Sequence, residues 1–151
     1  MDKKTFFMLF LLSFMFINIS GCGNTPKENP QLAEYESKLK TYYDDIITTS
    51  ESLNSINPED ANSKETYLNY IDSIKASVSG IDALEDPEGY EEVGTNAYAA
   101  LTQINNTSTL LHQIYLDNEY DWDKDNEAYN SYIECMKSLN SIGKILMTKN
   151  Q

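Results

Sequence analysis

The chain combines 151 residues with a strong excess of negative charge, since 24 Asp and Glu stand against 11 Lys and the formal net charge is −13. Proteins that bind nucleic acid need clustered cations against phosphate, so this composition excludes that class. The same charge argues against a protein that lies flat on an anionic membrane surface. The length is sufficient for one domain with a hydrophobic core.

The first 21 residues have the layout of a secretory signal. Lys3 and Lys4 give a basic start, an apolar run rich in Phe and Leu covers residues 6–17, and small residues follow it. This order is typical of a signal peptide, and the apolar run is shorter than the ~20 residues that a membrane-spanning helix needs. We therefore assign residues 1–21 to a cleaved signal and exclude them from the fold.

The end of this segment, Ile19-Ser20-Gly21-Cys22, matches the lipobox of bacterial lipoproteins at all four positions. In that class a branched aliphatic residue, a small residue and Gly or Ala precede the Cys, and this chain resembles it. The resemblance implies cleavage between Gly21 and Cys22, a diacylglyceryl group on the Cys22 sulfur and an acyl group such as palmitate on the new amine. Two or three acyl chains anchor a protein stably, whereas one chain binds only marginally. The expected location is the extracytoplasmic face of the cell membrane.

Residues 22–29 are predicted to be a short tether that carries the lipidated Cys, and residues 30–151 to be the folded domain. Three pairs of an Asx residue and Pro punctuate the chain: Asn29-Pro30, Asn57-Pro58 and Asp86-Pro87. Asx residues cap helices and Pro suits the first helical position, so each pair predicts a helix start. The acidic stretch from Asp121 to Asp125 predicts a fourth start, with Asp123 or Asp125 as the cap.

Between these starts the apolar residues recur every three or four positions, which is a helical spacing. In the first segment the predicted seam, which is the line of residues that faces the core, passes through Tyr42 and Thr49. Gly80 is expected to mark an early end or a kink of the second helix. Helices of similar length with short connections pack as antiparallel neighbours. The predicted fold is all-α, an antiparallel up-down four-helix bundle. The start and end of the domain then lie at the membrane-proximal pole, with the loop near Asn57 and the acidic loop at the distal pole.

The acidic stretch before the fourth helix suggests two kinds of site. Asp121, Asp123 and Asp125 stand at the first, third and fifth positions of a calcium loop, but Tyr132 takes the twelfth position, where Glu should be. A solvated turn that caps the helix is the preferred interpretation, and calcium binding is the minor alternative. Trp122, with Tyr120, could anchor a partner or fold back over the bundle end as a hydrophobic plug, and the plug is slightly favoured.

The sequence contains few features that are typical of a catalytic site. His112 is the only His, no carboxylate or Cys is spaced along the chain to partner it, and no nucleophile motif or phosphate-binding Gly-rich loop occurs. Cys135 is predicted to be a small buried residue on a helix. We predict that the protein is not an enzyme and holds no cofactor apart from the lipid on Cys22 and the alternative of calcium.

The stretch ALEDPEGYEEV, which opens the third predicted helix, resembles a pattern in small helical lipoproteins of low-GC Gram-positive bacteria. The expected function is a non-enzymatic protein-interaction module of the cell envelope, with another envelope protein as partner. The alternative is a lipoprotein that binds a small ligand or ion, or a protective factor in immunity or exclusion. The oligomeric state stays open, because four tyrosines beside the seam are either rim residues or an exposed contact set: Tyr43, Tyr70, Tyr98 and Tyr115.

Overall fold

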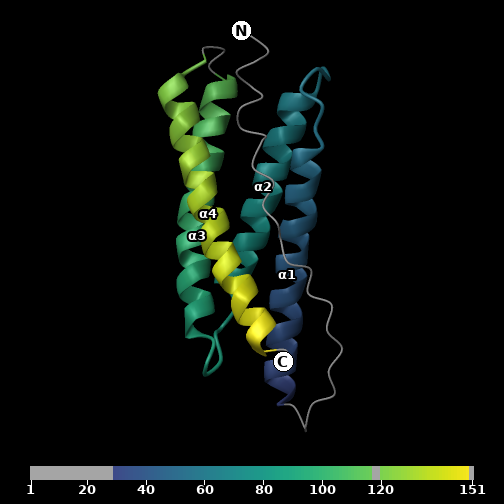
Figure 1. Ribbon diagram of the computed structural model, residues 1–151, viewed down its shortest axis with the longest axis vertical. Helices are drawn as coiled ribbons and strands as arrows, with labels where there is room; N and C mark the ends of the chain where they lie inside the picture. The colour runs from purple at the N-terminus through teal and green to yellow at the C-terminus, as the bar shows by residue number, and fades with distance from the viewer. Residues whose placement is uncertain (1–28, 117–119, 150–151) are drawn as a thin grey trace.

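The computed structural model describes residues 29–116 and 120–149, and these form four α-helices and no strand. The helices are α1 (Pro30–Asn54), α2 (Ser63–Asp82), α3 (Glu91–Leu116) and α4 (Trp122–Lys149). They run alternately up and down in one bundle, as predicted (Figure 1). The signal sequence, Cys22 and the tether up to residue 28 lie outside the described residues.

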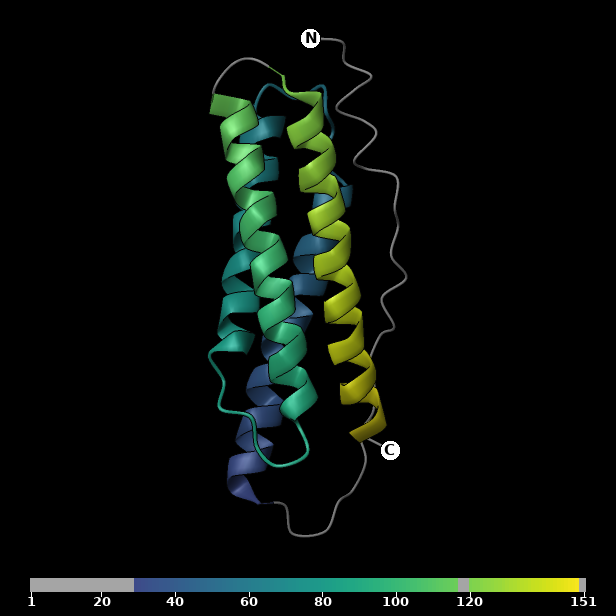
Figure 2. The same cartoon turned by 90° about the vertical axis from the view of Figure 1, so that its left-hand side faces the viewer.

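The bundle has two poles that we name by the chain segments they contain. The tether pole holds the start of α1, the connection 83–90 and the end of α4, and the far pole holds the connection 55–62, the end of α3 and the start of α4 (Figures 1 and 2). The predicted arrangement of ends and loops is therefore confirmed for the described residues. A helix rises ~1.5 Å per residue, so the 26 residues of α3 separate the poles by ~39 Å.

The first predicted helix start is confirmed, and the next two are wrong by several residues. Asn29 caps α1, because its side chain accepts a hydrogen bond from the Gln31 N–H and Pro30 takes the first helical position. Asn57 instead caps a turn by accepting from the Glu59 N–H at 3.1 Å, and α2 begins at Ser63.

The third start moves because the segment after Asp86 turns before it becomes helical. Gly89 has a φ of 87°, a left-handed conformation that favours glycine, and α3 begins only at Glu91. The Asp86 side chain is also engaged elsewhere, because it accepts a hydrogen bond from the Tyr35 hydroxyl at 2.7 Å. The Asx-Pro pairs thus mark connections correctly, but two of the three do not mark the first helical turn.

The core runs through the whole bundle and uses tyrosine as its aromatic residue. Leu and Ile from all four helices are fully buried, and Tyr35, Tyr43, Tyr67 and Tyr90 are each less than a tenth exposed. The five Phe residues of the chain all precede Cys22, so the domain has none. Tyrosine rings supply the same apolar surface as Phe, but each buried hydroxyl needs a polar partner.

The α1 seam differs from the prediction by one residue in its middle. Tyr43 and Ser50 are buried in place of Tyr42 and Thr49, which are half-buried. Glycines on the neighbouring helices explain the change: the Tyr42 ring lies against Gly80 of α2 and the Tyr43 ring against Gly143 of α4. Gly80 is therefore a packing position inside α2, which ends two residues later at Asp82.

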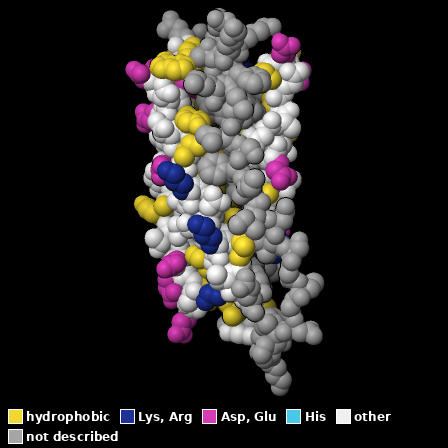
Figure 3. Space-filling view, viewed as in Figure 1, with side chains coloured by type: hydrophobic (Ala, Val, Ile, Leu, Met, Phe, Trp, Pro, Cys, Tyr) yellow, Lys and Arg dark blue, Asp and Glu magenta, His cyan; other side chains and the backbone are white. Residues whose placement is uncertain are grey.

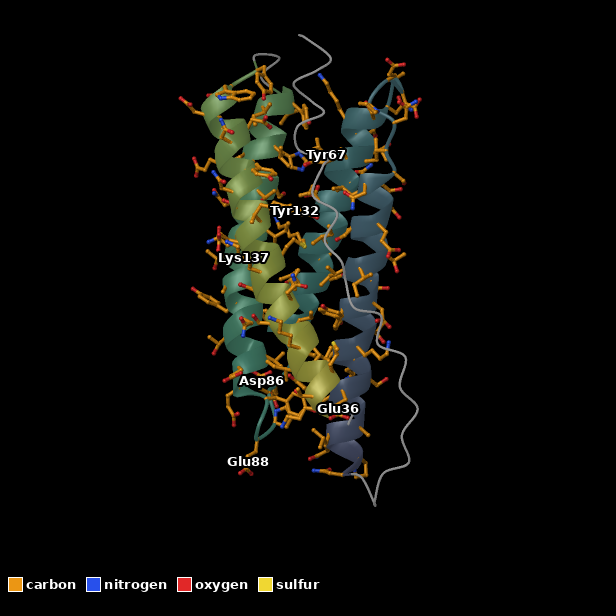
Figure 4. The ribbon with its side chains drawn as sticks, viewed as in Figure 1. Glu36, Tyr67, Asp86, Glu88, Tyr132 and Lys137 are labelled. Atoms are coloured by element: carbon orange, nitrogen blue, oxygen red, sulfur yellow. The ribbon has the colours of Figure 1, made fainter. Side chains whose placement is uncertain are left out.

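The tether pole is fastened by tyrosine–carboxylate pairs. The Tyr90 hydroxyl donates to Glu36 of α1, and the Tyr35 and Tyr90 rings meet edge to face with their centres 5.1 Å apart. Glu36 and Asp86 lie together at this end of the bundle in Figure 4. The Lys149 ammonium at the end of α4 lies 4.8 Å from the centre of the Tyr90 ring, which ties the last helix to the same cluster.

Candidate functional site

The far pole contains the site that the sequence singled out. Asp121 caps α4, because its Oδ1 accepts hydrogen bonds from the N–H groups of Asp123 at 3.0 Å and Lys124 at 3.1 Å. The prediction that Asp123 or Asp125 is the cap is wrong, since both lie inside the first helical turn. The cap directly precedes Trp122, which is the first residue of α4.

The three carboxylates of the predicted calcium alternative each have a different environment. Asp121 is the cap, Asp123 is exposed, and Asp125 accepts a hydrogen bond from the Tyr120 hydroxyl. Burial raises the pKa of Asp125, and the bond from Tyr120 offsets this only in part. In the part of the chain that the structure describes, no group of three or more His, Cys, Asp and Glu is placed to hold a metal ion.

The far pole exposes two large apolar side chains, Trp122 and Leu116. The Trp122 side chain is 48% exposed and its ring centre lies 6.1 Å from that of Tyr120, while Leu116 at the end of α3 is 75% exposed. Trp122 therefore lies against Tyr120 and leaves nearly half of its surface to solvent. Exposed aromatic residues are typical of contact sites.

A groove between α2 and α3 forms a second candidate, which the sequence analysis did not predict. Its volume is about 740 Å³, and polar side chains of both helices line most of it. At its centre the Asp72 carboxylate accepts a hydrogen bond from the Ser108 hydroxyl at 2.7 Å and lies 2.9 Å from Nε2 of His112. Burial acts to raise the pKa of Asp72, but these two contacts and the charge of Lys75 outweigh it and lower the pKa.

No carboxylate is spaced along the sequence to partner His112, but the fold brings one to it. Its carboxylate comes from α2, 40 residues earlier in the chain, and only the packing of α2 against α3 brings the two together. A search for partners along the sequence near His112 cannot find such a pair.

The order of these three side chains does not activate a nucleophile. In a Ser–His–Asp triad the imidazole lies between the two others and removes the proton of the hydroxyl. Here the carboxylate is in the middle, so the Ser108 hydroxyl donates to Asp72 and does not contact the imidazole. Cys135 is buried in the core, and this burial raises the pKa of its thiol to about 12. A thiol with so high a pKa is a poor nucleophile at neutral pH.

The outer face of α3 is the third candidate. Residues 93–116 hold no Asp, Glu, Lys or Arg, although 23% of the chain is charged. We call one line of residues along its solvent side the α3 outer stripe: Tyr98, Thr102, Asn105, Thr109, Gln113 and Leu116. Tyr98 is 68% exposed. The sequence shows this uncharged run, but a lack of charged residues does not by itself indicate a functional site.

The four tyrosines that the sequence grouped together separate in the structure. Tyr43 is in the core, Tyr70 and Tyr115 are half-buried against it, and only Tyr98 is mostly exposed. They are therefore not one contact surface. On the face of the molecule seen in Figure 3, acidic side chains lie along both edges and lysines lie over α4.

Removal of the α4 cap should cost more than removal of the next carboxylate. We expect Asp121→Ala to lower the free energy of unfolding by about 1 kcal/mol, because two backbone N–H groups lose their acceptor. Asp123→Ala is the matched control and should cost only a few tenths of a kcal/mol, through the helix dipole. Urea unfolding followed by circular dichroism measures both, and equal losses would contradict the assignment of the cap.

Comparison with known proteins places the chain in no family. No protein-family model, curated protein or solved structure matches it. Within the described ranges, no helix has both the length and the apolar character needed to cross a bilayer.

Proposed function

We propose that the protein is a lipoprotein of the extracytoplasmic membrane face, and that it acts without catalysis by binding another envelope protein with its far pole. The observation that carries this proposal is the exposure of Trp122, which lies beside Tyr120 at that pole. The lipobox at Cys22 supports the anchor. The buried Cys135 and the arrangement of Ser108, Asp72 and His112 support a function other than catalysis.

The geometry of the bundle suits a contact site at the far pole. A tether of residues 22–29 spans at most ~28 Å when fully extended, and α1 begins at the tether pole. The far pole lies ~39 Å further along the helices. Trp122 and Leu116 would therefore face away from the lipid, where a second envelope protein can reach them. Tryptophan is strongly enriched among residues that dominate binding energy at interfaces.

Cross-linking in intact cells tests the partner. Cells that produce the lipidated protein are treated with a cross-linker, and the captured proteins are identified by mass spectrometry. We expect one envelope protein to be captured reproducibly and to be lost from Trp122→Ala. Tyr98→Ala is the matched control, because it removes another exposed ring away from the far pole, and it should retain the partner. Capture that is unaffected by Trp122→Ala, or no capture at all, would contradict the proposal.

The anchor has its own test in the same cells. Cys22→Ala removes the sulfur that the lipid needs, so the protein should leave the membrane fraction, and the mass of the mature wild-type chain should show a start at Cys22 with acyl chains. A wild-type protein that stays unlipidated would overturn the anchor without affecting the assignment of the far pole.

The α2–α3 groove favours a second candidate function, the binding of a small polar ligand. It is open to solvent and offers the Asp72 and His112 side chains together with amides and hydroxyls. A screen of small polar compounds and calcium by thermal unfolding tests this candidate. Stabilisation that Asp72→Asn abolishes would support it.

A further inference from the structure

We infer that the α3 outer stripe is a self-association surface, on which a second copy of this chain packs with its own stripe, parallel and about a two-fold axis along the bundle. Only the parallel direction of the two copies rests on the proposed function, because two copies anchored in one membrane have their tether poles on the same side. The surface itself follows from charge, exposure and the spacing of residues on α3.

The distribution of negative charge over the helices favours this face for contact between identical copies. Asp2, Lys3 and Lys4 give residues 1–21 a net charge of +1, so the remainder of the chain carries −13 − 1 = −14. Two such domains repel each other, and contact is least costly where neither presents a carboxylate. The exposed face of α1 carries Asp45 and Glu51, and that of α4 carries Asp123 and Glu127. The α3 outer stripe carries none.

Four residues of the stripe line the same groove as the Asp72 carboxylate: Asn105, Thr109, Gln113 and Leu116. Asp72 accepts a hydrogen bond from Ser108, is paired with His112 and lies near Lys75. The Asp72 oxygens therefore already have hydrogen-bond partners within their own copy, and a second copy does not have to supply any. A second copy that approaches α3 meets hydroxyls, amides and apolar side chains.

The stripe is also complementary to itself. Tyr98 and Leu116 are 18 residues apart, about five helical turns, so they lie on the same side of α3 at a separation of ~27 Å. Near a two-fold axis a residue contacts its own counterpart, so parallel packing brings Tyr98 against Tyr98 and Leu116 against Leu116. Between these apolar ends lie Thr109 and Gln113, whose hydroxyl and amide groups both donate and accept hydrogen bonds.

The size of the surface predicts a weak dimer that the membrane strengthens. A strip ~27 Å long and one to two helices wide buries roughly 1,000 Å² in total, which is near the lower limit for specific interfaces. Anchoring in one membrane raises the effective concentration of the copies and fixes their orientation. We therefore expect little dimer in dilute solution and substantial dimer on the cell surface.

Cysteine cross-linking on intact cells tests both the surface and the direction. Tyr98→Cys and Leu116→Cys are introduced singly into the lipidated protein and treated with a short bismaleimide. Cys135 is buried and the Cys22 sulfur is expected to carry lipid, so the new thiols are the reactive ones. We expect each variant to form cross-linked dimers with itself, while Glu134→Cys on the outer side of α4 stays monomeric.

Two outcomes would overturn the inference. Equal cross-linking of Glu134→Cys would mean that the α3 outer stripe is not selected. Cross-links that form only when Tyr98→Cys and Leu116→Cys are produced together would mean antiparallel packing. Neither outcome depends on the envelope partner, because Trp122→Ala should abolish partner capture and leave the self cross-link unchanged.

Sedimentation of the unlipidated domain gives a second, independent measurement. Its average mass should rise with concentration and with salt, because salt screens the repulsion between the two acidic domains over ~8 Å. Tyr98→Glu should shift the monomer–dimer midpoint to at least about tenfold higher concentration, whereas Thr41→Glu, which adds the same charge to an exposed position on α1, should leave it unchanged. A constant monomer mass together with absent self cross-links would refute the dimer.

Discussion

Raising the pH above about 10, the ordinary pKa of tyrosine, should unfold the domain cooperatively. Burial raises the pKa of Tyr43 to about 12 and that of Tyr132 to about 12. Burial is also the main reason why the pKa rises for five further tyrosines, Tyr35, Tyr67, Tyr90, Tyr115 and Tyr120. Figure 4 shows Tyr67 and Tyr132 pointing into the space between the helices in the upper half of the bundle.

The direction of these pKa shifts decides whether the stability of the domain falls or rises with pH. A tyrosine with a raised pKa in the folded state ionises first in the unfolded chain, so its contribution to stability is complete below pH ~10 and is lost as the pH rises towards the folded pKa. A shift of two units corresponds to about 3 kcal/mol. Tyr43 and Tyr132 together therefore account for roughly 5 to 6 kcal/mol, which is comparable with the whole stability of a small domain.

Circular dichroism and the absorbance of tyrosinate, recorded together against pH, check this prediction. We expect loss of helix and ionisation of tyrosine to occur in one steep transition between pH ~10 and ~12. Tyr43→Phe keeps the ring and removes one buried hydroxyl, so it should move the transition to higher pH. Tyr98→Phe changes an exposed ring and is the control. Helix that survives the ionisation of most tyrosines would contradict the prediction.

Gly143→Ala should be among the most damaging single substitutions in α4. A Cβ at this position would lie 2.2 Å from the Tyr43 hydroxyl oxygen and 2.8 Å from the ring carbon that bears it. Tyr43 is only 3% exposed and cannot swing away. We expect a loss of about 2 to 3 kcal/mol in the free energy of unfolding from overpacking, after the gain of ~1 kcal/mol in helix propensity is subtracted.

Gly80→Ala is the matched comparison for this effect. Its Cβ would also lie close to a tyrosine ring, 2.5 Å from Tyr42 Cε1, but Tyr42 is half-buried and can move outward. We expect a loss well below that of Gly143→Ala in the same urea titration. The double variant Tyr43→Phe with Gly143→Ala should recover part of the stability, since the nearest clashing atom is gone. Equal losses at the two glycines, or no recovery, would show that the Tyr43 contact does not set the cost.

The architecture was predictable because it depends on local and periodic information. Asn29 and Pro30 were enough to place the first helix, and the three-four spacing of apolar residues gave the bundle. The predicted starts of α2 and α3 were wrong because an Asx residue followed by Pro caps a turn as readily as a helix. The turn at Gly89 and the bond from Tyr35 to Asp86 decide between the two, and only the folded chain brings Tyr35 to Asp86.

The candidate sites were predictable only where their residues are neighbours in sequence. Tyr120, Trp122 and Asp125 could be grouped because they belong to one short segment, although the role of each carboxylate depended on which residue became the cap. Asp72 and His112 could not be grouped, because α2 and α3 must first pack. The missing charges on α3 were visible in the sequence, but their significance depends on which side of the helix faces solvent.

The position of Trp122 has a practical consequence for the study of this protein. It is the only tryptophan in the chain, and it lies half-exposed at the far pole beside Tyr120. Selective excitation of its indole therefore gives an emission signal from that pole alone, while the tyrosines that fill the core stay silent. Quenching of this emission by a soluble quencher can report shielding of the far pole without an introduced label, and it can be read separately from contacts along the outer side of α3.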